Sequence, residues 1–377
     1  MLHRRMLIAA AAGLFVAAIV PARAADTVSA NDTARFLAGL PPTAESPLAR
    51  LAEEPAWQEH ARTFDAAFEQ VEQSQLTRIR AWSASNLSAP RPAMFYMFGG
   101  PDFLYANAFY PDAKTYVLSG LEPAGSVADL TTLRGSLAPD LARLRVSLRW
   151  ILQYSYFITS QMGSDLHRGR LTGTLPVLYV FLARSGKTIR EVTPVVLDDN
   201  GAVEPDDTAR RVPARGVKIV FAGGDGQERT LYYFSTNLAN DGVSKSKFLA
   251  FCEALGPGES LVKSASYLLH RNDFSMVREF LLANSAVMVQ DDTGIPLAYY
   301  DPEKWALQPF GQYVGPIPVF RYMYQAKYAA LFKNSQPIDF GIGYRWKPTQ
   351  SNVLLAVRKQ PGVSFSESVV GRVPNKQ

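Results

Sequence analysis

The chain has 377 residues, of which 39 are Lys or Arg, 34 are Asp or Glu and one is Cys. This near balance of charge, with no cluster of Lys and Arg, argues against nucleic acid as a partner. The single Cys252 leaves no intramolecular disulfide to hold the fold. Stability must therefore come from an ordinary apolar core, for which 47% hydrophobic residues are sufficient.

The first 24 residues have the pattern of a secretory signal. A cationic start is followed by an apolar run from Met6 to Val20, and then by Pro21 and the small-residue pattern Ala22-Arg23-Ala24. The run is shorter than the roughly 20 residues of a membrane-spanning helix, and the pattern predicts cleavage after Ala24. No later run is long enough to span a bilayer. We therefore expect a soluble, non-transmembrane protein in the periplasm or secreted from the cell.

The remaining chain is expected to contain three parts. These are a helical N-terminal arm at 25–90, an α/β globular domain at 91–360 and a C-terminal tail at 361–377. Between 55 and 87 the apolar residues recur at steps of three and four, which predicts one long helix with a single apolar face.

Residues 94–122 combine a strand, a glycine turn, a helix and a second strand. Met94–Phe98 is a short apolar run, Gly99-Gly100-Pro101-Asp102 is a turn, 103–110 is helical in composition and 114–121 is rich in β-formers. A strand–helix–strand connection of this kind predicts a parallel strand pair. The expected fold class is α/β: a mixed sheet with a Rossmann-like βαβ unit, helices packed on it and a helical N-terminal element.

This unit resembles the first βαβ unit of the S-adenosylmethionine-dependent methyltransferases. The resemblance implies that the loop with Gly100 lets the backbone approach the cofactor, and that Glu122 after the second strand binds the ribose hydroxyls. Phe98 and Asp102 stand where the family usually has glycines, which would place the Asp102 carboxylate against the cofactor. The alternative is that Gly99-Gly100 form a tight turn and Asp102 caps the next helix. Further along, the expected elements do not follow the family's order.

The rest of the sequence alternates between segments with the apolar spacing of helices and segments with the composition of strands. Helices are expected near 127–133, 139–162, 244–255, 260–270, 274–284 and 319–333. Strands are expected near 188–197, 215–222, 228–235, 286–290, 295–300 and 308–314, and in a hairpin of 338–345 with 351–358.

Two polar segments are candidate sites. Between two expected helices, His270 would act as a general base oriented by Asp273, and Arg271 would bind an anion. Helix capping and surface ion pairing explain the same residues without a substrate. Asp291 and Asp292 follow an expected strand, at the edge where open α/β sheets bind ligands. They would act with His270 or hold a metal, although a turn also explains them, and we assign no metal site.

Missing motifs narrow the choice of function. The chain has no Gly-x-Ser-x-Gly elbow, His-Glu-x-x-His helix, complete Gly-x-x-x-x-Gly-Lys-Ser/Thr loop or Cys-x-x-Cys pair. We favour a non-catalytic, exported protein that binds a small-molecule or envelope ligand in an aromatic-lined cleft. One alternative is an extracytoplasmic hydrolase or transferase that uses His270 with Asp273 or Asp291/Asp292. Another is a degenerate methyltransferase-like fold. The sequence determines neither the cofactor nor any protein partner.

Overall fold

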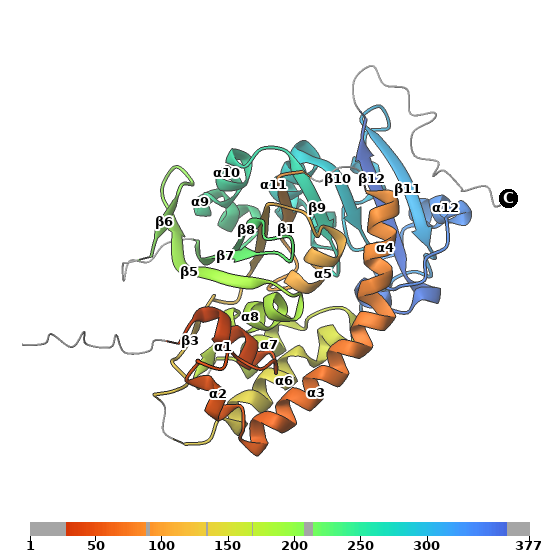
Figure 1. Ribbon diagram of the computed structural model, residues 1–377. Coiled ribbons are helices and arrows are strands. Elements are labelled where there is room, and N and C mark those ends of the chain that lie inside the picture. The colour runs from red at the N-terminus through yellow and green to blue at the C-terminus, as the bar shows by residue number, and fades with distance from the viewer. Residues whose placement is uncertain (1–27, 88–90, 133–134, 168, 207–213, 360–377) are drawn as a thin grey trace, which may run out of the picture.

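The computed structural model describes residues 28–87, 91–132, 135–167, 169–206 and 214–359 (Figure 1). The predicted signal at 1–24 and the predicted tail at 361–377 lie outside these residues. Among the described residues, no helix combines the length and the apolar character needed to cross a bilayer.

A ten-stranded mixed sheet runs through the molecule in the order β11-β12-β10-β9-β1-β2-β8-β7-β5-β6. The strands are β1 (Ala93–Tyr96), β2 (Thr115–Gly120), β5 (Thr188–Leu197), β6 (Val203–Pro205), β7 (Arg215–Ala222), β8 (Glu228–Ser235), β9 (Gly258–Val262), β10 (Ser285–Gln290), β11 (Trp305–Gly311) and β12 (Asn352–Arg358). A separate antiparallel pair joins β3 (Ser126–Val127) to β4 (Leu171–Thr172).

The centre of the sheet is parallel and its edges are antiparallel. Strands β8, β2, β1, β9 and β10 are parallel to one another. On one side, β7 is antiparallel to β8; on the other, β12 is antiparallel to both β10 and β11. From β1 the chain proceeds to β2 and β8 on one side, and then returns to build β9 and β10 on the other. The sheet therefore reverses its direction of growth between β1 and β9.

The predicted βαβ unit and the α/β fold class are confirmed. Strand β1, helix α5 (Phe103–Phe109) and strand β2 follow one another, and β1 pairs with β2 in parallel, with Met94 opposite Tyr116. Alternate residues of β1 point to opposite faces: Met94 and Tyr96 enter one apolar core, and Ala93 and Phe95 enter the other. This is the pattern of a strand that is buried on both faces.

Helices cover both faces of the sheet (Figure 1). The larger core lies under α1 (Ala30–Leu37), α2 (Leu48–Leu51), α3 (Pro55–Val71), α4 (Thr77–Asn86), α5, α6 (Ala138–Tyr154), α7 (Thr159–Asp165) and α8 (Leu175–Arg184). The second core lies under α9 (Asn240–Ser246), α10 (Phe248–Ala254) and α11 (Ser275–Asn284). A short helix, α12 (Ala326–Leu331), packs Tyr328 against Leu354 of β12.

The long N-terminal helix is also confirmed. Helices α3 and α4 continue into each other through a π-helical turn at Glu72–Leu76. Trp82 near the end of α4 packs edge-on against Phe310 of β11, with ring centroids 5.1 Å apart. The helical segment therefore shares its core with the far edge of the sheet.

Several expected elements differ from the structure. The stretch 260–270 is not a helix; it contains the end of β9 and a single 3₁₀ turn, η2 (Leu268–His270). The segment 338–345 is not a strand, and β12 pairs with β11 in place of it. The helix expected at 127–133 is absent from the described residues there. The helix expected at 139–162 breaks at Ser155, whose φ is 68°, and the one at 244–255 breaks at Lys247, whose φ is 59°. The segment 295–300 holds a 3₁₀ turn, η4 (Leu297–Tyr299), and 319–333 holds η5 (Pro318–Met323), α12 and η6 (Phe332–Asn334).

Candidate functional site

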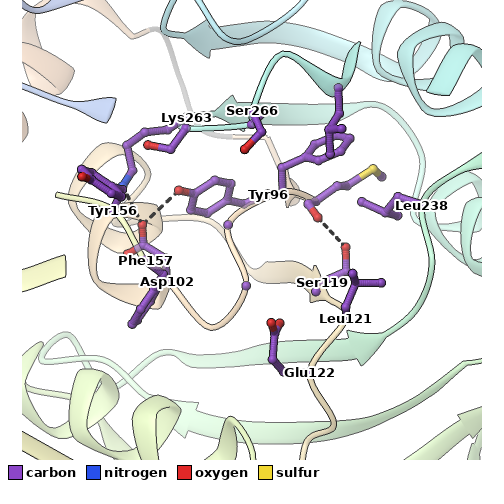
Figure 2. A pocket seen from close by; sticks show the side chains of 18 of the residues that line it. Tyr96, Asp102, Ser119, Leu121, Glu122, Tyr156, Phe157, Leu238, Lys263 and Ser266 are labelled. Atoms are coloured by element: carbon purple, nitrogen blue, oxygen red, sulfur yellow. Dashed lines mark hydrogen bonds and ion pairs between the residues drawn. The ribbon is translucent and has the colours of Figure 1, made fainter. Parts of the chain in front are cut away.

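A cavity of about 210 Å³ lies at the carboxyl ends of β1, β2, β8 and β9 (Figure 2). It is many times larger than the roughly 10–15 Å³ that a single water needs. The cavity lies beside the point between β1 and β9 where the sheet reverses its direction of growth. In open α/β sheets, this is the position at which ligands bind. We call it the cleft.

A buried ion pair closes one end of the cleft. The Lys263 ammonium, just after β9, lies 3.0 Å from the Asp102 carboxylate, and both side chains are 1% exposed. Tyr96 donates its hydroxyl to the same carboxylate over 3.0 Å, and Figure 2 shows the three side chains meeting there. Burial and the adjacent carboxylate raise the pKa of Tyr96 well above its usual value, so this hydroxyl keeps its proton.

The Asp102 carboxylate also caps α5. Its second oxygen accepts the backbone N–H of Tyr105 over 3.0 Å. The interpretation of Asp102 as a helix cap is therefore confirmed. Lys263 has two further contacts: it donates to the backbone carbonyl of Ser155, and its ammonium lies 4.1 Å from the centre of the Tyr105 ring. These contacts satisfy a charge that is costly to remove from water.

The turn between β1 and α5 needs both of its glycines. Gly100 has φ of +58° and donates its N–H to the Ser119 carbonyl of β2 over 3.0 Å. A Cβ at Gly99 would lie 2.3 Å from the Tyr96 ring. The glycines thus let the turn close over the tyrosine that Asp102 holds, and the interpretation of Gly99-Gly100 as a tight turn is confirmed.

Glu122 lies after β2 on another side of the cleft, and its carboxylate points into the cavity in Figure 2. One of its oxygens is buried and has no hydrogen-bond partner among the described residues. A Cβ at Gly120 would lie 3.1 Å from that oxygen, so the glycine leaves room for it. A buried carboxylate oxygen without a partner is an acceptor that a ligand can satisfy.

The rest of the wall is amphipathic. The hydroxyls of Thr236 and Ser264 are also buried without a hydrogen-bond partner in the described part of the chain. The apolar members of the wall include Phe98, Leu121, Leu238, Leu268 and Phe274. The cleft therefore suits a ligand with an apolar, flat part and several polar groups.

The predicted His270–Asp273 pair does not form in the structure. Asp273 accepts two hydrogen bonds from Arg271, at 2.9 and 2.8 Å, on the exposed surface. His270 packs its ring edge-on against Tyr267, 5.2 Å between centroids, and no hydrogen bond joins it to Asp273 among the described residues. Burial lowers the pKa of His270 to about 4. None of His270, Arg271 and Asp273 is among the described residues that line the cleft.

Asp291 and Asp292 lie behind the cleft and hold one of its loops. Asp291 accepts the backbone N–H of Ser264 over 2.9 Å, and Asp292 accepts the hydroxyl of Tyr267. Ser264 and Tyr267 have φ of 55° and 57°, which is a strained conformation for residues other than glycine. Burial, with the neighbouring Asp292, raises the pKa of Asp291 to about 7. The two carboxylates are therefore positioned to shape the loop rather than to contact a ligand.

Across the described ranges, no three or more His, Cys, Asp and Glu side chains gather closely enough to hold an ion. Of the residues proposed from the sequence, the structure brings Gly100, Asp102 and Glu122 together at the cleft.

Sequence reasoning missed Lys263, Tyr96 and Ser264. The segment 260–270 was expected to be a helix, which would not place Lys263 at the end of a central strand. The sequence holds one clue: Gly256-Pro257-Gly258 precedes the segment, and such breakers are common just before a buried strand.

Comparisons with protein-family models, with curated proteins and with solved structures find no match for this chain.

Proposed function

We propose that the cleft binds a phosphate-free nucleoside, and that S-adenosylmethionine is the first candidate. The observation that carries the proposal is the order of the strands around Glu122. Numbered along the chain, β1, β2, β8, β9, β10, β11 and β12 lie in the order 3-2-1-4-5-7-6, and only the seventh is antiparallel. This is the sheet arrangement of the methyltransferases that residues 94–122 resemble. Beyond β8 the sheet carries three further strands, β7, β5 and β6, which this numbering leaves out.

The site also fits the ligand chemically. Glu122 follows the second strand, where the family's acidic residue binds the ribose hydroxyls, and its buried oxygen has no other described partner. The apolar wall near Leu238 and Phe274 suits a flat base. Bound S-adenosylmethionine would supply an electrophilic methyl group.

Asp102 argues against a phosphate-bearing nucleotide. In dinucleotide-binding folds the pyrophosphate lies at the N-terminus of the helix after the first strand. Here the Asp102 carboxylate occupies that end of α5, 3.0 Å from the Tyr105 N–H. The charged side chains among the described residues of the cleft are Asp102, Glu122 and Lys263, one more acid than base. This balance favours a cationic ligand such as a sulfonium over a phosphate.

Binding is favoured over turnover. The described residues of the cleft include no histidine, and Tyr96 and Lys263 are already engaged by Asp102. Glu122, whose buried oxygen has no hydrogen-bond partner among the described residues, is assigned to the ribose hydroxyls and not to proton transfer. The alternative hydrolase or transferase built on His270 gains no support from the observed contacts.

Isothermal titration calorimetry tests the proposal. We expect S-adenosylmethionine, S-adenosylhomocysteine and adenosine to bind, and ATP and NAD to bind far more weakly. Glu122→Gln should weaken binding by about 10- to 100-fold, because a hydrogen bond to a charged group contributes about 1.5–3 kcal/mol. Glu253→Gln on the exposed surface of α10 is the matched control and should bind like the parent protein. Equal affinity in Glu122→Gln, or a preference for ATP, would contradict the proposal.

A further inference from the structure

The segment between β11 and α12 lies at an outer edge of the molecule (Figure 1) and carries several exposed apolar side chains. Eight large hydrophobic residues are exposed in the described part of the chain, and four of them fall between 314 and 324. They are Val314 (48% exposed), Val319 (66%), Tyr322 (76%) and Tyr324 (58%). We call residues 314–324 the apolar loop. Scattered single hydrophobic residues are ordinary on a surface, whereas a contiguous group marks an interaction site.

The backbone of the apolar loop is held in place. Arg345 donates to the carbonyls of Gly315 and Pro316, at 3.0 and 2.7 Å. At the other end, the N–H of Gln325 donates to the Tyr313 hydroxyl over 3.0 Å. A loop fixed at both ends presents its side chains in one arrangement, which lowers the entropic cost of binding.

One aromatic residue of the loop points inward and anchors it. The Phe320 ring lies 5.3 Å from Tyr267 and 5.5 Å from Tyr344, centroid to centroid. Its neighbours Val319 and Tyr322 remain exposed. The loop thus divides into an anchor and an outward-facing apolar tip.

The segment of the chain that contains the apolar loop has an excess of positive charge. Residues 312–350 contain five basic residues and one acidic residue, Asp339; the bases are Arg321, Lys327, Lys333, Arg345 and Lys347. A second copy of the chain would bring the same excess of positive charge, which disfavours self-association through this surface. The partner should therefore be anionic.

Trp346 and Lys347 follow Arg345, which holds the apolar loop, and here half-buried aromatic rings lie beside a cation. The Trp346 ring lies 5.4 Å from Tyr154, and the Lys347 ammonium is 5.4 Å from the Trp346 centroid. The Trp150 ring of α6 is tilted against Tyr154, with the ring centroids 5.1 Å apart. Tyr and Trp combined with Lys and Arg are the residues that gather at the boundary between lipid and water.

We propose that the apolar loop docks the protein on the surface of an anionic lipid bilayer. Val319 and Tyr322 enter the headgroup region, and the exposed Arg321, Lys327, Lys333 and Lys347 contact the lipid charges. The attachment is peripheral and reversible, because a few side chains and a basic patch give far weaker binding than a spanning helix. Salt screens such contacts, so binding should weaken as ionic strength rises.

Sedimentation with phospholipid vesicles tests the proposal. We expect the protein to bind phosphatidylcholine vesicles containing phosphatidylglycerol, to bind pure phosphatidylcholine at least tenfold more weakly, and to lose most binding in high salt. Val319→Ser with Tyr322→Ser should reduce binding to the anionic vesicles at least tenfold. Val146→Ser with Met276→Ser removes two exposed hydrophobic side chains elsewhere and should bind like the parent.

Three results would overturn the proposal. The first is equal binding by the Val319/Tyr322 variant, with circular dichroism showing that both variants are folded. The second is equal binding to neutral and anionic vesicles. The third is a parent protein that does not bind vesicles but forms a dimer, or binds an acidic protein, through Val319 and Tyr322.

Discussion

Replacing Lys263 with Met is expected to lower the free energy of unfolding by about 3–5 kcal/mol, because it leaves the Asp102 carboxylate buried without its cation. The two groups are 3.0 Å apart and 1% exposed. The hydroxyl of Tyr96 and the N–H of Tyr105 would remain as partners of Asp102, but neither carries a compensating charge. Urea denaturation followed by circular dichroism measures the change.

Two further variants make this prediction specific. Adding Asp102→Asn to Lys263→Met should recover part of the loss, because the remaining group is then neutral. Lys304→Met removes an exposed partner of Asp301, 3.5 Å away, and should change stability by less than about 1 kcal/mol. A Lys263→Met protein as stable as Lys304→Met would show that the buried pair does not hold this end of the cleft.

Asp291→Asn is expected to change how stability depends on pH. Burial raises the pKa of Asp291 from 3.8 to about 7, so between these values the unfolded state ionises while the folded state keeps its proton. The contribution of Asp291 to stability is thus complete below pH 4 and is lost as pH rises to about 7. At about 1.4 kcal/mol per pKa unit, the parent should lose roughly 2–4 kcal/mol relative to the variant over this range.

The measurement is a series of urea titrations of both proteins from pH 4 to pH 8. The difference in the free energy of unfolding, parent minus variant, should fall as pH rises. Asp225→Asn supplies a control whose difference should stay constant from pH 4 to pH 8, because a hydrogen bond from Arg229 lowers the pKa of Asp225. Its contribution is present above the ordinary pKa and disappears in acid. A constant or rising difference for Asp291→Asn would contradict the assignment.

Local pattern predicted local structure well in this chain. Each part of residues 94–122 has one strongly preferred local conformation: the short apolar run at Met94, the glycine turn and the β-rich run before Glu122. Together they form the parallel pair of β1 and β2. The apolar stripe between 55 and 87 likewise produced α3 and α4. These elements depend on neighbours in sequence, and for that reason they could be predicted.

Long-range pairing could not be predicted. Strand β8 pairs with β2, although a long insertion separates the two strands in the chain. Strand β12 pairs with β11, and not with the segment 338–345, which is nearer in sequence. The prediction of a helix at 260–270 was wrong, because the apolar spacing in a short run fits a buried strand equally well. Without β9 in place, nothing indicated that Lys263 would reach Asp102.

The candidate site divides in the same way. Gly100, Asp102 and Glu122 belong to the local βαβ unit, and all three line the cleft. His270, Asp273, Asp291 and Asp292 were chosen because polar residues were crowded in sequence. In the structure, Asp273 instead forms a surface ion pair with Arg271. Asp291 accepts a hydrogen bond from Ser264 in the strained loop. In this chain, the polar residues that are close together in sequence stabilise the structure. The residues that line the cleft follow separate strands.

A crystal structure of the protein with S-adenosylhomocysteine is the most direct test of the central claim. The ribose hydroxyls are predicted to bind the Glu122 carboxylate, and the adenine to lie against the apolar wall near Leu238. Clear density in the cleft, lost in crystals of Glu122→Gln, is the expected result. A cleft without ligand density at a concentration that saturates the calorimetric binding, or a ligand bound elsewhere, would contradict the claim.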